Sequence, residues 1–335
     1  MKFENFIGID VSKNTLDLSL LTGEAELVEI QIQNDRKSIE KAIGKLFKQH
    51  GLDPKKVLLC AEFTGHFGNK LIDVAIKLGL NLWMESAYNI IHSQGLVRGK
   101  SDRVDALRIV EYAKRFQDKA VILKVGSDQV QLLKSLSAER DLIVKDIAKY
   151  KSQLKQEEGF FDQKYFQQKK KRIDKLIKTN QKVLDEIESK IDQLISDDPE
   201  IKKNMDRIMA IEGIGKQTAL ATIVATHNFS KFTDPRKFSC HIGCAPFKYQ
   251  SGTSLKSKAK VSHKANKNLK RLFHMAAVST LRMKGDIRDY YDRKVEEGKH
   301  KMSVINAIRA KLIARIFAVV NQDRDYEKNY KHSLA

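Results

Sequence analysis

The sequence predicts an α/β domain at the N-terminus, followed by a pair of long helices and a basic, mostly helical C-terminal region. Three observations support this order. Short β-like runs alternate with helical ones up to about residue 120, apolar residues recur at helical spacing over 128–196, and the positive charge concentrates after residue 200. With 335 residues, the chain is long enough for two or three domains that each bury a core.

The first region begins with a predicted hairpin and continues as an alternation of helices and strands. Three strands come first, at 6–11 (FIGIDV), 15–21 (TLDLSLL) and 27–33 (LVEIQIQ). They are followed by a helix over 36–49, a buried strand at 57–63 (VLLCAEF), a helix over 67–78, a strand at 81–85 (NLWME) and a helix from Ser101. The order βββαβαβα is the ribonuclease-H-like arrangement rather than a pure βαβ repeat.

The middle region has no proline and predicts two long helices that turn near Gly159. Their heptad spacing indicates a coiled-coil spacer or dimerisation arm, although an antiparallel hairpin within one chain uses the same pattern. Beyond it we expect short helices around two glycine turns, a Lys-rich loop at 248–260, and helices over about 262–283 and 302–320. The predicted domains are an α/β domain at 1–125, coiled-coil helices at 126–198 and a basic helical domain at 199–335.

The charge distribution indicates a polyanionic partner. The chain has 62 Lys and Arg against 42 Asp and Glu, and residues 201–335 hold 28 of these basic residues but only 11 acidic ones. Between Glu212 and Asp286 there are 14 basic residues and one acid, Asp234. This region repels itself unless a polyanion neutralises it, and nucleic acid is the polyanion we expect. The alternative is a solvated face that only aids solubility, but such faces usually intersperse both signs.

Composition also excludes several classes of protein. No run approaches the ~18 apolar residues of a membrane span, and the first residues lack the layout of a secretory signal, so we expect a cytoplasmic, nucleoid-associated protein. Cys60, Cys240 and Cys244 are too few for a disulfide framework. Cys240-His241 and Cys244 resemble half of a zinc site, but no second pair lies at ligand spacing, so we interpret them as core thiols.

Four acidic residues of the first region form a candidate metal site. Asp10 ends the first strand, Glu62 ends the buried strand, and Asp102 and Asp105 open the helix SDRVDALRIVEYA, where positions i and i+3 share a face. Four converging carboxylates need divalent cations, and oxygen ligands suit Mg²⁺ or Mn²⁺. Two such ions ~3.5–4 Å apart clamp the entering and leaving oxygens of a phosphodiester. Taken singly, the acids also fit helix starts and a hairpin.

Two segments of the basic region are candidates for contact with a phosphate. In IEGIGKQTA, Gly213 and Gly215 before Lys216 form a tight turn at a helix start, in the style of a helix-hairpin-helix contact, or they simply close a turn between helices. In PFKYQSGTS, the Ser251 hydroxyl lies next to a glycine in a loop with Lys248, Lys256, Lys258 and Lys260. That hydroxyl is a candidate nucleophile, although the same residues are typical of a surface turn.

Taken together, these motifs resemble the DEDD-type transposases of the insertion-sequence 110 family, which are related to the Piv-type invertases. The resemblance spans about residues 5–325. IGIDVSK, AEFTGHFG and KSDRVDALRIVEYA resemble the RuvC-like domain of that family, and IEGIGKQTA, CAPFKYQSGTS and SHKANKNLKRLFHMAA resemble its transposase domain. His263 and Ala265 stand where the family more usually has Lys and Gly.

The resemblance implies roles for individual residues. Asp10, Glu62, Asp102 and Asp105 take the places of the four metal-binding acids, and Ser251 falls at the serine nucleophile. It implies DNA as donor and target, and a structured guide RNA encoded beside the gene. It also implies a dimer or tetramer whose active site is shared between subunits. The residues expected to bind nucleic acid are Gly213, Gly215, Lys216, Lys248, Lys256, Lys258, Lys260, Lys264, Lys267, Lys270 and Arg271.

We therefore predict a transposase or site-specific recombinase that cuts and rejoins DNA through Ser251 with Mg²⁺ or Mn²⁺ held by the four acids. Two rivals remain open. One is a RuvC-like endonuclease or junction resolvase that uses water, and the other is a non-catalytic nucleic-acid scaffold. A sugar kinase of the actin-like fold ranks last because the sequence has no second Gly-rich phosphate loop where that fold needs one.

Overall fold

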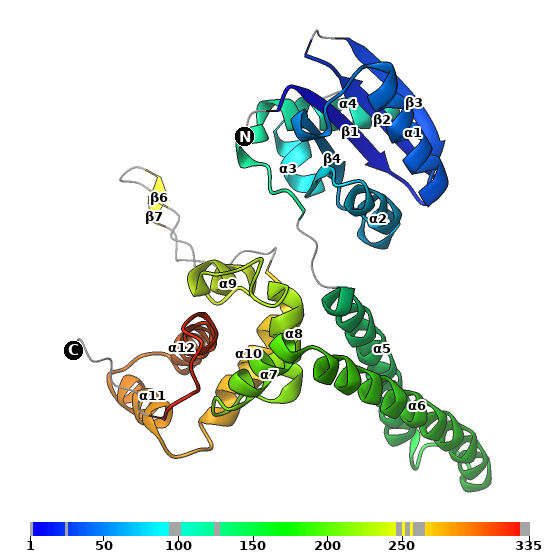
Figure 1. Cartoon of the computed structure of the whole chain (residues 1–335). Helices are drawn as coiled ribbons and strands as arrows, with labels where there is room; N and C mark the ends of the chain where they lie inside the picture. The colour runs from blue at the N-terminus through cyan, green and yellow to red at the C-terminus, as the bar shows by residue number, and fades with distance from the viewer. Residues whose placement is uncertain are drawn as a thin grey trace. The chain divides into compact units, whose positions relative to one another are not determined.

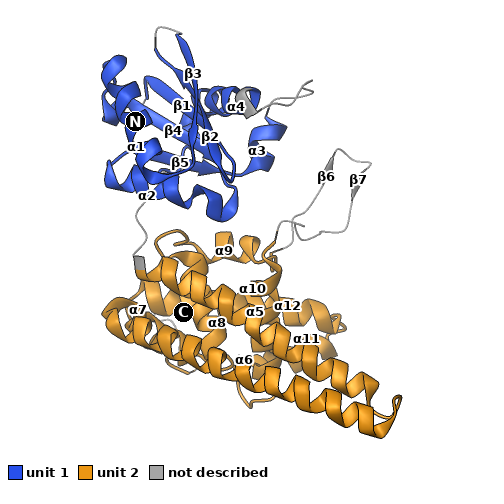
Figure 2. Ribbon diagram, turned by 90° about the vertical axis from the view of Figure 1, so that its right-hand side faces the viewer, with its two compact units in different colours: residues 1–125 blue, residues 126–335 orange. Residues whose placement is uncertain are grey.

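The computed structural model describes residues 3–23, 26–93, 102–123, 128–245, 250–251, 255–256 and 265–328. Within these ranges, seven side chains lie outside the description, those of Asp102, Arg103, Asp128, Gln250, Ser251, Leu255 and Lys256. The chain divides into two compact units, Met1–Val125 and Gly126–Ala335 (Figure 2).

The first unit is built on a five-stranded sheet with the order β3-β2-β1-β4-β5 (Figure 1). The first three strands form an antiparallel meander, and β4 and β5 run parallel to β1. The strands are β1 (Asn5–Val11), β2 (Thr15–Leu21), β3 (Leu27–Gln33), β4 (Val57–Glu62) and β5 (Asn81–Glu85). The helices are α1 (Arg36–Gln49), α2 (Asn69–Lys77), α3 (Ala87–His92) and α4 (Asp102–Arg115), with single 3₁₀ turns at Pro54–Lys56, Gly65–Gly68 and Gln117–Lys119.

Helices cover both faces of this sheet because its central strands are apolar on both sides. On one face, residues such as Ile7 and Leu59 form a core with Ile39 and Ile43 of α1 and with Val74 of α2. On the other face, a second cluster joins the sheet to α4, and it contains Phe6, Leu58, Cys60, Trp83, Ile109, Val110 and Ala113. A sheet buried on both faces needs near-continuous apolar strands, as in VLLCAE.

The predicted order βββαβαβα is confirmed, and the strands at 15–21, 27–33 and 81–85 and the helix at 36–49 have the predicted bounds. The sequence reading missed α3. This helix has only six residues, which is too short for helical periodicity to show in the sequence.

The second unit begins with α5 (Asp128–Glu157) and α6 (Gln163–Asp197), which lie side by side in both views (Figures 1 and 2). They turn around Gly159, whose φ of 84° favours glycine, and Asp162 caps α6 by accepting a hydrogen bond from the Tyr165 amide at 3.0 Å. Arg140 and Glu188 join the helices by an ion pair of 2.7 Å. The two predicted long helices are therefore present as a hairpin within one chain, and their role in pairing subunits stays a prediction.

The remaining helices pack around a core centred on Phe238, Phe273 and Phe317. They are α7 (Pro199–Met209), α8 (Lys216–Thr226), α9 (Pro235–His241), α10 (Lys267–Thr280), α11 (Asp286–Glu296) and α12 (Lys301–Asn321). Between α9 and α10, the two-residue strands β6 (Gln250–Ser251) and β7 (Leu255–Lys256) pair antiparallel. No helix in the described ranges is long and apolar enough to cross a membrane.

The start of α10 differs from the prediction of a helix from about 262. The helix begins at Lys267 because Asn266, in an extended conformation, caps it and accepts a hydrogen bond from the Leu269 amide at 3.1 Å. Asparagine favours this position because its side chain replaces the missing partner of a first-turn amide. Residues 262–264 lie outside the described residues.

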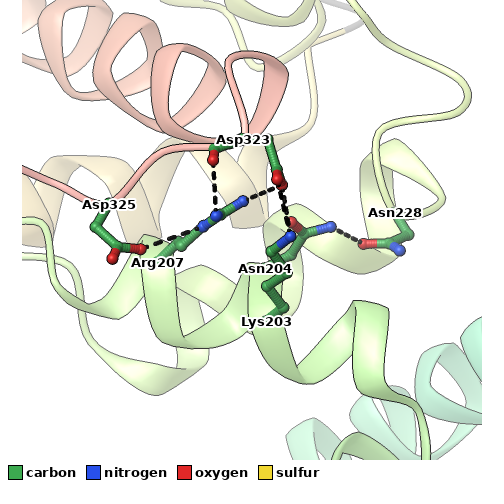
Figure 3. A network of polar contacts seen from close by, with 6 residues as sticks. All are labelled: Lys203, Asn204, Arg207, Asn228, Asp323 and Asp325. Carbon is green, nitrogen blue, oxygen red and sulfur yellow. Dashed lines mark hydrogen bonds and ion pairs between the residues drawn. The ribbon is translucent and has the colours of Figure 1, made fainter.

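A polar network connects α7 with the chain that follows α12 (Figure 3). Asp323 accepts from Lys203 at 2.7 Å and pairs with Arg207, which also donates to the Asp323 carbonyl at 2.9 Å and reaches Asp325 at 3.4 Å. The partners lie 116 to 120 positions apart in the sequence, so the network ties α7 to the distant segment that follows α12.

Candidate active site

A row of polar side chains crosses the sheet of the first unit near the carboxyl end of β1. In the backbone register of the sheet, Asp10 lies opposite Asp17 of β2, and Asp17 lies opposite Gln31 of β3. Glu62 of β4 lies opposite Glu85 of β5. Ile9 and Ala61 are the last residues in register between the parallel strands β1 and β4. Asp10 and Glu62 are the next residue on each strand, so they lie beside each other. Residues in register across a sheet point to the same face, so this row lies on one face.

Helix α4 covers that same face and runs antiparallel to β1. Gly8, two residues before Asp10, faces Ala106 and Val110 so closely that a Cβ on it would lie 2.3 Å from the Ala106 carbonyl oxygen. At the other end of the strand, the Phe3 amide donates to the Gln117 side chain at 2.9 Å. The first turn of α4 therefore lies toward the end of β1 that carries Asp10, which is the end where Glu62 also lies.

Three of the four predicted acids can be placed by their side chains. Asp10 and Glu62 are half-buried, and Asp105 is half-buried and accepts a hydrogen bond from Arg108 at 2.7 Å. The backbone of Asp102 opens α4, one turn before Asp105, but its side chain lies outside the described residues. Among the side chains that the structure describes, no three His, Cys, Asp or Glu residues gather closely enough to hold a metal ion.

The donor chemistry nevertheless suits a divalent cation. Asp10 and Glu62 present carboxylate oxygens from adjacent strands, and the first turn of α4, with its two further acids, lies at the same edge. Hard oxygen donors of this kind are the ligands that Mg²⁺ and Mn²⁺ prefer. The chemistry of these carboxylates therefore suits such an ion, and the four-acid metal site stays a prediction.

The sequence reading missed two acids of the row, Asp17 and Glu85. Asp17 is only 3% exposed, and its two oxygens accept from the Gln31 amide at 3.0 and 3.2 Å. Glu85 ends β5 as Glu62 ends β4, and it accepts from the Tyr112 hydroxyl of α4 at 3.2 Å. Burial and the Glu85 carboxylate raise the pKa of Tyr112 to about 12. The sequence does carry a signal for Glu85, because NLWME ends in an acid after an apolar run in the same way as VLLCAE.

In the second unit, the structure describes the backbone of Ser251 but not its side chain. In the antiparallel register of β6 and β7, Ser251 lies opposite Leu255 and Gln250 lies opposite Lys256. Lys248, Lys258, Lys260 and Lys264 lie outside the described residues, as does the side chain of Lys256. The predicted roles of this serine segment, residues 246–264, therefore stay predictions.

The glycine turn between α7 and α8 has the tight geometry that its sequence predicts. Gly213 has a φ of 82°, and a Cβ on it would lie 2.2 Å from the Thr280 side chain of α10. Gly215 is the N-cap of α8 and offers no side chain to the amides of the first turn. Lys216 pairs with Asp192 of α6 at 2.5 Å, so part of its charge is already neutralised within the protein.

The predicted basic residues of α10 divide by exposure. Lys267 and Arg271 are one turn apart and exposed, and Arg271 contacts Asn268 at 3.0 Å. Lys270 is half-buried. The three cysteines are free thiols, of which Cys60 and Cys244 are buried, and burial raises the pKa of both.

Comparison with known proteins identifies both halves of the chain. Residues 7–157 match a DEDD transposase family model described as "Transposase", and residues 205–292 match the model "Transposase IS116/IS110/IS902 family". The pilin gene-inverting proteins of Moraxella lacunata and Moraxella bovis are each 24% identical to this chain over 331 residues, which is 97% of this chain and 98% of theirs. RuvC of T. thermophilus, solved with a Holliday junction substrate, aligns with 36% of this chain and 99% of its own at 12% identity and a TM-score of 0.27.

These matches define the class of the protein as a DNA transposase or recombinase, an enzyme that transfers DNA strands. The chain belongs to the insertion-sequence 110 family of transposases. The acids at the edge of the sheet lie in the first matched stretch, and Ser251 lies in the second.

Proposed function

We propose that this transposase cuts and rejoins DNA through Ser251, with a divalent cation held by Asp10, Glu62, Asp102 and Asp105. The observation that carries the proposal is the register of the sheet, which sets Asp10 beside Glu62. The first turn of α4 lies at the same end of these strands. A bound Mg²⁺ or Mn²⁺ would supply charge stabilisation at a phosphodiester and at the oxygen that leaves it.

In this proposal the Ser251 hydroxyl oxygen attacks the scissile phosphorus and loses its proton. The bond between phosphorus and the 3′ oxygen breaks, the 3′ oxygen takes up a proton, and a phosphoserine link to the 5′ end of the DNA forms. Attack by another 3′ hydroxyl on that link restores a phosphodiester and the free serine. Rejoining needs no external energy because each step exchanges one phosphoester bond for another.

The basic residues hold the DNA in this proposal. Lysines of the serine segment and the exposed Lys267 and Arg271 of α10 contact phosphates, which position the DNA without reading its sequence. The α5–α6 hairpin would pair subunits into a dimer or tetramer. A structured guide RNA would select donor and target sites, as the family resemblance implies. The relatives that invert pilin genes support site-specific recombination as the reaction.

The test is to trap the covalent intermediate. The protein, purified together with the RNA that it binds in the cell, is incubated with a nicked donor duplex and Mg²⁺, and DNA-linked protein is detected on a denaturing gel. We expect an adduct with the natural chain, none with Ser251→Ala, and an undiminished adduct with Ser254→Ala, a matched serine in the same segment. An adduct that persists in Ser251→Ala refutes the role of this serine. Cleavage by the natural chain without any adduct favours the rival nuclease that uses water.

A further inference from the structure

Arg309 is a buried positive charge with no acidic partner among the described residues. It lies on the apolar face of α12 between Ile305 and Leu312, and only 5% of its surface is exposed. Among the residues that the structure describes, no group accepts a hydrogen bond from its Nε atom and no carboxylate forms an ion pair with it, while its side chain forms a hydrogen bond with the Cys244 thiol. A buried ion without a partner costs several kcal/mol, so a protein retains one where the charge has a use.

The side chains around Arg309 do not balance its positive charge, because Lys270 is itself a cation and neither His274 nor Cys244 carries a negative charge. Lys270 and His274 lie one turn apart on α10, the helix that packs against α12. The His274 Nδ1 atom is also buried without a partner. Burial and the charge of Arg309 lower the pKa of His274, while Arg309 and Lys270 both act on the Cys244 thiol. These four residues contain three nitrogen-bearing groups and no anion.

The cluster lies where the serine segment begins and ends. Cys244 comes two residues before this segment, and the Asn306 amide of α12 donates to the Cys244 carbonyl at 2.6 Å. On the other side of the segment, the backbone N–H of Asn266 donates to the His241 carbonyl at 2.9 Å. Residues 246–264 hold five lysines and no acid, so this segment has no carboxylate to offer Arg309.

The face of α10 that carries Lys270 and His274 also carries a basic residue at the surface. Positions 267, 270 and 274 are three or four residues apart and therefore share one side of the helix. His274 and Lys270 are half-buried, and Lys267 is exposed. The basic side chains on this side of α10 thus extend to the surface of the unit.

We propose that Arg309, Lys270 and His274 form an anion site at the base of the serine segment, and that its ligand is a phosphate of the DNA backbone. The choice of DNA rests on the proposed function, whereas the site itself rests on the buried guanidinium, whose Nε atom has no hydrogen-bond partner among the described residues. Arginine suits this task because its planar fork donates two parallel hydrogen bonds to a phosphate. Arg309 lies outside both stretches that match transposase families, 7–157 and 205–292.

The first experiment measures thermal unfolding of the full chain in inorganic phosphate and in sodium chloride of equal ionic strength. A ligand that binds only the folded state raises the melting temperature. We expect phosphate to raise the melting temperature of the natural chain and not that of Arg309→Met, in which an uncharged, apolar side chain replaces the arginine. In chloride, Arg309→Met should melt above the natural chain because it no longer buries an unpaired ion.

The matched control is Arg315→Met, in the same helix. Arg315 pairs with Asp286, so its loss should lower the melting temperature and leave the phosphate response intact. Arg309→Lys keeps the charge without the fork and should retain a weaker response. If Arg309→Met melts below the natural chain or fails to fold, or if it keeps the full phosphate response, Arg309 is a structural residue and the proposal is wrong.

The second experiment measures binding of a DNA duplex without divalent cation, so that no strand is cut. We expect Arg309→Met to weaken binding about 10- to 100-fold, the usual size of a lost charge-assisted hydrogen bond. Ser251→Ala should bind as the natural chain does. A missing covalent adduct would overturn the proposed function but would not contradict the anion site. Unchanged DNA affinity in Arg309→Met would overturn only the assignment of DNA as the ligand of this site.

Discussion

Gly8 of β1 lies directly against the main chain of Ala106 in α4, and a methyl group on Gly8 would come within 2.3 Å of the Ala106 carbonyl oxygen. The close approach is possible because glycine has no side chain on that face of the strand. Asp10 follows Gly8 on the same face, and Asp105 precedes Ala106 in the helix. The glycine therefore sets the distance between the strand and the helix that carry the predicted acids.

Replacing Gly8 by Ala should destabilise the first unit. The added methyl group would overlap three backbone atoms of α4, and overpacking of this kind costs about 1–3 kcal/mol. Urea unfolding followed by circular dichroism would measure the loss. Gly44→Ala is the matched control, since Gly44 lies inside α1 with nothing within 4 Å of its Cβ position and should gain up to about 1 kcal/mol. Equal stability of the two variants would contradict this account of Gly8.

Neutralising the paired acids should abolish DNA cleavage and preserve the fold. Asp10→Asn and Glu62→Gln keep the shape of each side chain and remove the charge that a divalent cation needs, so we expect cleavage to fall about a hundredfold or more. Chelation of divalent ions should have the same effect on the natural chain. Gel assays of strand cutting would measure both.

Glu29→Gln, which changes an exposed acid of β3 in the same unit, is the control for these variants and should cut normally. Full cleavage by Asp10→Asn in the presence of Mg²⁺ would show that the acids at the edge of the sheet play no part in the reaction. DNA binding without cleavage in every variant, the natural chain included, would favour the scaffold alternative.

The Asp323 network should make the second unit sensitive to acid. Hydrogen bonds from Lys203 and then Arg207 lower the pKa of Asp323 below its ordinary value near 3.8. The ionised carboxylate therefore stabilises the fold at pH values above that ordinary value, and this contribution disappears as the pH falls through the lower, folded-state pKa. Melting temperatures measured from pH 7 down to about 3 should separate the natural chain from Asp323→Asn at neutral pH and converge in acid.

Asp325→Asn is the control for Asp323. The Asp325 side chain is 93% exposed and lies 3.4 Å from Arg207, so its loss should change the melting temperature less. If the curves for the natural chain and Asp323→Asn run parallel down to the lowest pH, the network does not contribute in the way described.

Local patterns predicted most of the elements because each needs only its own residues. TLDLSLL and LVEIQIQ alternate like strands, and their bounds agree with the structure. Asn266 shows the limit of this reasoning, since the helical pattern extends before it while the chain uses it as a cap. The candidate site was predicted in part: the acids at the ends of β1, β4 and α4 were recognised, but Asp17 and Glu85 were not.

The sequence by itself determined the ribonuclease-H-like order of the elements, the two long helices, the basic C-terminal region and the family, because these depend on composition, periodicity and motif order. Only the tertiary structure decided that Asp10 lies beside Glu62, that Gly8 lets α4 touch the sheet, and that Arg309 is buried with no described acid to pair with it. Those relationships depend on strand register and helix packing between residues far apart in the chain, and free energies of burial and close contact are set by neighbours in space.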